Sequence, residues 1–164
     1  MGRWQEQLTL WRDALNISPN YNLFDRFVMR VRGLNPTNRI TGILNLVVAE
    51  KSKHIRKKTK ATIQKALSDT IVDISQNPCR RSYSTSDGIA HTICTSSSLV
   101  HLGLGRMLHP KELLWMQGHN PKSTLFPEGM ALTDIKKLAG EGMALPCVAV
   151  CIWSQYLVKA FPDP

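Results

Sequence analysis

The sequence predicts an α/β or α+β fold, with a small sheet, a helical and basic amino-terminal half and a buried carboxy-terminal helix. Three patterns lead to this fold class. Apolar residues form an amphipathic stripe over 40–48, β-branched stretches lie at 70–76 and 89–95, and an almost wholly apolar stretch fills 145–160. Such a mixture is typical of helices packed on a sheet. With 164 residues the chain is long enough for one hydrophobic core.

The first half is expected to be helical. Short apolar clusters before residue 34 are separated by the turn-forming stretch Asn-Ile-Ser-Pro-Asn, which predicts two helical pieces. The stripe over 40–48 predicts the clearest helix, with either Thr37 or Asn38 as its N-cap. The stretch 51–65 is rich in Lys and Arg and is either a solvated helix face or a phosphate-contacting surface.

Two strands are expected to form the small sheet. Residues 70–76 alternate apolar and polar side chains, which predicts a strand with Ile71 and Ile74 buried. Residues 89–95 are rich in β-branched side chains, which favour strands. The serines at 96–98 are expected to form a loop outside the core.

Two short helices follow the sheet. The first is expected to start at Pro110, because the first turn of a helix tolerates a missing N–H, and to stop at Gly118 in the left-handed conformation. The second is expected to have Thr133 or Asp134 as its cap and to end at Gly140.

The inward side chains of that second short helix are expected to be Ile135 and Leu138. The last helix, over 145–160, has Pro146 near its start and is apolar on almost every face. This pattern predicts a helix buried against the sheet.

Composition narrows the classes of function. The formal charge of +9, from 21 Lys and Arg against 12 Asp and Glu, favours a polyanionic partner such as nucleic acid. The four cysteines form no CxxC pair or zinc-like Cys/His cluster, so no metal site is expected. Neither a run of eighteen apolar residues nor a signal peptide is found, so we expect an intracellular protein without a membrane span.

Two segments carry a family resemblance. Residues 105–118 read GRMLHPKELLWMQG, and residues 140–146 read GEGMALP. In this order they resemble the ninth and tenth motifs of cytosine-5 DNA methyltransferases. The ninth motif has the form R-x-L-T-P-R-E-x-x-x-L-Q-G, and the tenth has the form G-N-(S/A)-(V/F)-x-x-P followed by an apolar helix.

The resemblance suggests a division of the chain. Residues 1–69 are a helical, basic amino-terminal segment, and residues 70–164 are the end of a target-recognition region plus the two motifs. The resemblance implies a fragment of a Rossmann-like methyltransferase. The complete enzyme would transfer a methyl group from S-adenosyl-L-methionine to carbon 5 of an extruded cytosine in DNA.

The same resemblance implies a cofactor-binding segment at Gly140, Glu141, Gly142 and Met143, where small residues let the backbone approach a ligand closely. Glu141 stands where the family has Asn. A carboxylate can accept a hydrogen bond from the ligand's amino group, but it cannot donate one and it repels the ligand's carboxylate.

DNA contact is expected from Arg80, Arg81, Arg106 and Lys111, because guanidinium and ammonium groups bind phosphate. Gln117 is expected either to satisfy loop backbone or to contact DNA. His109, at the family's Thr position, is expected to cap the helix that follows it.

No catalytic residue is expected in this chain. The family's chemistry needs a Gly-rich cofactor turn, a Pro-Cys nucleophile and a Glu-Asn pair. Cys79 follows a proline but lies too close to the ninth motif, and no Glu-Asn-Val follows it. We therefore expect a carboxy-terminal fragment that is inactive alone, partners a missing N-terminal catalytic half and, in a eukaryote, is nuclear. Two alternatives are a non-catalytic, basic nucleic-acid-binding module and an interaction module that has lost both functions.

Overall fold

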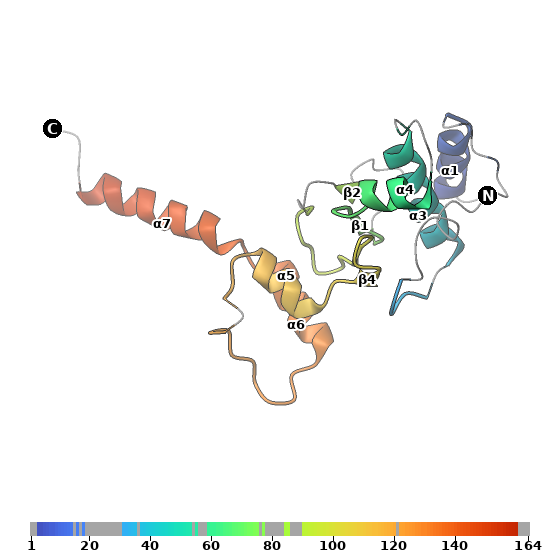
Figure 1. Cartoon of the computed structure of the whole chain (residues 1–164). Coiled ribbons are helices and arrows are strands. Elements are labelled where there is room, and N and C mark those ends of the chain that lie inside the picture. The colour runs from blue at the N-terminus through green and yellow to red at the C-terminus, as the bar shows by residue number, and fades with distance from the viewer. Residues whose placement is uncertain are drawn as a thin grey trace. The chain divides into compact units, whose positions relative to one another are not determined.

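The structure is a computed structural model of the chain, which divides into two compact units (Figure 1). Unit 1 comprises Met1–Thr92 and Ser97–Leu108, and unit 2 comprises Ile93–Ser96 and His109–Pro164. The suggested boundary between residues 69 and 70 is based on the family resemblance, and it does not coincide with the boundaries of these two units. The structure describes residues 3–14, 16, 18, 31–35, 37–53, 55, 59–75, 77, 84–85, 90–120 and 122–160.

Three helices of unit 1 are described: α1 (Arg3–Ala14), α3 (Asn38–Ser52) and α4 (Lys60–Ala66). Thr37 is the N-cap of α3, because its hydroxyl accepts a hydrogen bond from the Ile40 N–H at 3.4 Å, which confirms the first of the two predicted caps. All residues over 42–49 are buried. The helix is therefore enclosed more completely than its amphipathic stripe predicts.

A four-stranded antiparallel sheet completes unit 1, with strand order β2-β1-β3-β4. Its strands are β1 (Ile71–Asp73), β2 (Ser84–Thr85), β3 (Leu99–His101) and β4 (Arg106–Met107). Helices and antiparallel strands make the chain a member of the α+β class, so the coarse fold prediction is confirmed.

The first predicted strand is confirmed as β1. It begins with the buried Ile71, and Ile74, which directly follows the strand, is also buried. Val72 pairs with Val100 of β3 at the centre of the sheet. The apolar core of unit 1 combines α3, α4, β1 and β3. Among the described residues it includes Val31, Ile43, Leu44, Val47, Val48, Ile63, Leu67, Val72, Ile74, Val100 and Leu102.

The second predicted strand is wrong in position. Residues 90–94 have no regular structure, and the strand lies at Leu99–His101; residue 89 lies outside the described residues. The prediction that the serines lie outside the core is also wrong for Ser97, which is fully buried. Its hydroxyl donates to the buried Asp73 carboxylate at 3.1 Å. A buried polar partner compensates for the serine's polarity, and a hydrophobic pattern does not reveal such a partner.

Unit 2 contains α5 (Pro110–Met116) and α6 (Leu132–Glu141), which pack against each other (Figure 1). The predicted end of α5 is confirmed, since Gly118 has a φ of +92°. The predicted caps of α6 are wrong: Ala131 is its N-cap and makes no side-chain hydrogen bond. Helix α6 also ends at Glu141, one residue beyond the predicted Gly140.

The predicted inward face of α6 is partly right. Ile135 is buried, but Leu138 is 45% exposed and Ala139 is the other buried side chain. The two buried residues lie four apart, which places them on one face of the helix.

Helix α7 (Leu145–Ala160) has the predicted bounds, with Pro146 as its second residue. The prediction that it is buried is wrong. Val150 is 67% exposed and Trp153 is 61% exposed, and every side chain over 145–158 is exposed except the half-buried Val148. A helix that is apolar on all faces needs cover on every side. No described helix of unit 2 packs along the length of α7 (Figure 1).

Candidate functional site

The start of α5 is fixed by reciprocal capping. The His109 Nδ1 accepts a hydrogen bond from the Lys111 N–H at 3.2 Å, and the His109 N–H donates to Glu112 Oε2 at 2.7 Å. Pro110 occupies the first helical position, where no N–H is needed. The predicted capping role of His109 is therefore confirmed, and the helix in the segment that resembles the ninth motif has a fixed start.

Gln117 connects the segment 105–118 to the segment 140–146. Its side chain is 8% exposed, and Nε2 donates to the Ala139 carbonyl at 2.6 Å and to the Gly142 carbonyl at 3.2 Å. The backbone carbonyl of Gln117 accepts a hydrogen bond from the Leu145 N–H at 2.8 Å. Gln117 thus bonds to residues on both sides of the link between α6 and α7. Of its two predicted roles, satisfying loop backbone is confirmed.

Glycine is required at two positions near Gln117, namely 118 and 140. A Cβ on Gly118 would lie 2.9 Å from Pro146 Cδ, and the positive φ is itself strained for other residues. A Cβ on Gly140 would lie closer than 3.0 Å to backbone atoms of Cys94 and Thr95. The glycines therefore let α5, α6, the first turn of α7 and the segment 93–96 approach one another closely.

The four predicted cofactor-binding residues are consecutive but differ in exposure. Gly140 is half-buried against the backbone of residues 94–95. Glu141 and Gly142 are exposed, and Met143 is 71% exposed. The small size of Gly140 has a packing reason, while Glu141 to Met143 present carboxylate, backbone and thioether to solvent. Cofactor binding by these residues stays a prediction.

The predicted DNA-binding residues do not share one unit. Arg106 is half-buried at the start of β4 in unit 1, and its guanidinium donates to the Met107 carbonyl at 3.1 Å. Lys111 lies on α5 in unit 2, with Nζ 5.0 Å from the centre of the Phe126 ring. Arg80 and Arg81 lie outside the described residues, as does Cys79.

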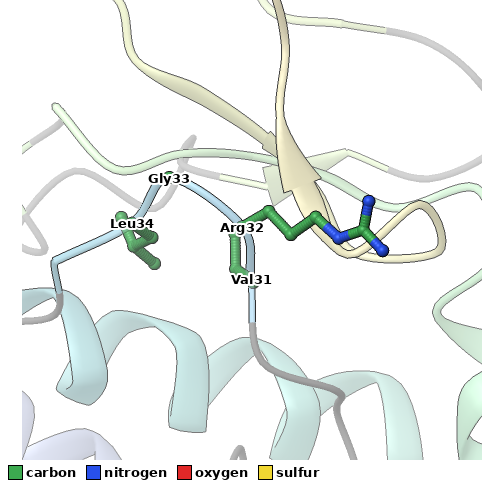
Figure 2. A pocket seen from close by; sticks show the side chains of 4 residues that line it. All are labelled: Val31, Arg32, Gly33 and Leu34. Carbon is green, nitrogen blue, oxygen red and sulfur yellow. The ribbon is translucent and has the colours of Figure 1, made fainter.

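Unit 1 contains a pocket that the sequence pattern does not indicate. It has a volume of about 430 Å³ and is lined by Val31, Arg32, Gly33 and Leu34 (Figure 2). The Arg32 N–H donates to the Gly105 carbonyl at 2.8 Å, while the Arg32 side chain extends away from Leu34. The described lining residues are two aliphatic residues, a glycine and an arginine, and this set includes no acid–base pair or nucleophile.

A buried polar cluster around Asp73 is also missing from the sequence predictions. The carboxylate is fully buried and accepts hydrogen bonds from Ser75, Ser97 and Ser98. The available signal is an aspartate within the apolar run Ile-Val-Asp-Ile, because an ionised carboxylate in such a place needs hydrogen-bond donors.

Among the described residues, no three His, Cys, Asp or Glu side chains are grouped so that they could hold a metal ion. The thiols of Cys94, Cys147 and Cys151 are exposed and form no disulfide within this part of the chain. None of the described helices combines the length and apolarity needed to cross a bilayer.

No protein-family profile, curated protein or solved structure matches this chain. The resemblance to cytosine-5 DNA methyltransferases therefore depends on the two motif segments themselves.

Proposed function

We propose that the chain is the carboxy-terminal part of a cytosine-5 DNA methyltransferase. It contributes DNA contact and one wall of the S-adenosyl-L-methionine cleft to the methylation of cytosine in DNA. The observation that carries the proposal is the Gln117 joint, in which one buried side chain bonds to Ala139 and Gly142. This side chain thereby connects residues of the two segments that resemble consecutive family motifs.

The joint supports a cofactor-facing role for the residues that it holds. Gln117 and Gly118 fix both ends of the link that contains Gly142 and Met143. Gly142 is exposed and has no side chain, so a ligand can approach it closely. The Glu141 carboxylate can accept a hydrogen bond from the amino group of the cofactor.

Helix α7 supports the proposal of a missing N-terminal catalytic half. Residues 145–158 contain no charged side chain, yet nearly all of them are exposed. Contiguous exposed apolar surface on this scale is typical of an interaction site. An apolar surface of the catalytic half would cover α7. A Rossmann-like parallel sheet is part of this proposal and would belong to that half, because the strands described in unit 1 are antiparallel.

The proposed DNA contacts are electrostatic. Arg106 and Lys111, together with Arg80 and Arg81, would bind phosphate. The exposed Lys53, Lys60 and Lys65 add positive charge to unit 1. Phosphate contacts position a protein on DNA without reading its sequence, so this chain would not determine the target motif through them.

Titration calorimetry with S-adenosyl-L-methionine tests the cofactor part of the proposal. The full chain should bind the cofactor weakly, and Glu141→Asn should strengthen binding by roughly tenfold, because the amide donates a hydrogen bond and no longer repels the ligand carboxylate. Glu128→Asn is the matched control, since Glu128 is also exposed in unit 2 but lies outside the joint. No binding by either the natural chain or Glu141→Asn would remove the cofactor wall from the proposal.

A non-catalytic nucleic-acid-binding module is the second candidate, favoured by the net charge of +9 and the exposed lysines of unit 1. It predicts DNA binding whose affinity falls steeply with salt concentration, without cofactor binding. If neither DNA nor cofactor binds, the interaction-module alternative is favoured.

A further inference from the structure

The Asp73 carboxylate holds a short segment of chain by several hydrogen bonds. Its Oδ1 accepts from the Ser75 N–H at 2.9 Å, the Ser75 hydroxyl at 2.6 Å and the Ser98 N–H at 3.1 Å. Its Oδ2 accepts from the Ser97 hydroxyl at 3.1 Å. Because both Asp73 and Ser97 are fully buried, each of these hydrogen bonds compensates for lost hydration.

The backbone adds to this anchor. The Ile74 N–H donates to the Ser98 carbonyl at 3.0 Å, so residues 97–98 are bound to the end of β1 by main chain and side chain together. The side-chain bonds of Asp73 therefore add to main-chain pairing at this place.

The residues directly before this anchor contact the tenth-motif segment. The backbone of Cys94 and Thr95 lies against Gly140 so closely that no side chain fits between them. Only Ser96 separates Thr95 from the anchored Ser97. The segment 93–98 is therefore anchored at one end by Asp73 and contacts Gly140 near the other.

We infer that Asp73 is a positioning residue for the Gly140 segment and acts through residues 93–98. Anchoring Ser97 and Ser98 restricts the conformations of Cys94 and Thr95, so less entropy is lost when these residues pack on Gly140. Weakening the anchor raises the frequency with which this contact opens. This coupling requires no bound cofactor, so its test is independent of the proposed methyltransferase function.

Amide hydrogen exchange on the full chain tests the coupling, with Ser97→Ala as the perturbation. Exchange of the Ser98 N–H should accelerate about tenfold, because the variant loses the hydrogen bond from the Ser97 hydroxyl to the buried Asp73 carboxylate. Exchange of the Gly142 N–H, which donates to the Leu138 carbonyl at 2.9 Å, should accelerate about threefold through local opening.

Ser52→Ala is the matched control. Ser52 is also a buried serine of unit 1, but its hydroxyl bonds locally to the Ala49 carbonyl at 3.1 Å. This variant should leave exchange at Gly142 unchanged. An equal acceleration at Gly142 in Ser52→Ala would mean general destabilisation and would overturn the inference.

Asp73→Asn supplies a second, milder perturbation that preserves shape. The amide keeps one acceptor oxygen and can donate to the Ser97 hydroxyl, but its bonds are weaker because the charge is gone. Exchange at Ser98 and Gly142 should rise together and by less than in Ser97→Ala. Acceleration at Ser98 without any change at Gly142, in either variant, would show that Asp73 does not position the Gly140 segment.

Discussion

Replacement of Gly140 by alanine tests the packing of the tenth-motif segment most sharply. In an exposed helix interior the change would stabilise α6 by about 1 kcal/mol, because alanine is the better helix former. At this position the new Cβ would lie closer than 3.0 Å to backbone atoms of Cys94 and Thr95. Backbone atoms cannot rotate away, so α6 and residues 93–96 must separate by about 1 Å to restore ordinary contact.

Such separation loosens the packing of Ile135 and Ala139, both of which are buried on α6. Overpacking of this kind costs about 1–3 kcal/mol and occasionally more. We expect Gly140→Ala to lower the free energy of unfolding of unit 2 by about 2 kcal/mol net of the helix gain. For a unit of this size that loss corresponds to a fall in melting temperature of roughly 10 °C, measured by circular dichroism.

Gly42→Ala is the control for Gly140→Ala. Gly42 also lies within a helix, but its added Cβ would meet only the end of the Leu8 side chain, at 2.8 Å from Cδ1. A flexible side chain can move, so this variant should change stability by less than about 0.5 kcal/mol. The packing argument is refuted if Gly140→Ala is as stable as the natural chain, or if both variants lose the same stability.

Three further predictions concern unit 2. Gln117→Ala removes the two hydrogen bonds to Ala139 and Gly142 and should lower the free energy of unfolding by about 1–3 kcal/mol; an unchanged urea midpoint would argue against the joint. Glu112→Ala should destabilise α5 by about 1 kcal/mol, whereas Glu112→Gln, which can still accept from the His109 N–H, should retain most of the stability in the same urea titration. Equal losses in the two Glu112 variants would contradict the capping interpretation. The chain alone should self-associate, as measured by light scattering. The double variant Val150→Glu with Trp153→Glu should be monomeric at equal helix content, because both side chains are exposed on α7. A natural chain that is monomeric at high concentration would be inconsistent with an uncovered α7.

Local chemistry explains which elements the sequence could predict. The caps at Thr37 and His109 and the stop at Gly118 each depend on contacts or backbone strain within a few residues. The start of α6 at Ala131 has no side-chain cap, so its two polar neighbours at 133 and 134 indicated the wrong N-terminus.

Long-range pairing explains the errors in the sheet. The Ser97 hydroxyl bonds to Asp73 across 24 positions of sequence, and only the pairing of β1 with β3 brings the two together. The serine run therefore resembles a solvated loop until the sheet is known. The same holds for Gln117, whose partners are 22 and 25 positions away.

The prediction that α7 is buried failed because apolarity indicates that a helix needs cover, without indicating what supplies it. Within unit 2, Leu145 bonds to the Gln117 carbonyl and Pro146 lies against Gly118, while most of the later residues of α7 are exposed. Under the proposed function, the remaining cover comes from the catalytic half.

Methyl transfer from labelled S-adenosyl-L-methionine to duplex DNA, measured with the chain alone and together with the polypeptide encoded immediately upstream, tests the proposed function most directly. We predict label at carbon 5 of cytosine only when both polypeptides are present, and loss of that label when Val150 and Trp153 are both replaced by glutamate. Label transferred by the chain alone, or no label with both polypeptides present, would contradict the proposal that this chain completes a methyltransferase whose nucleophile lies elsewhere.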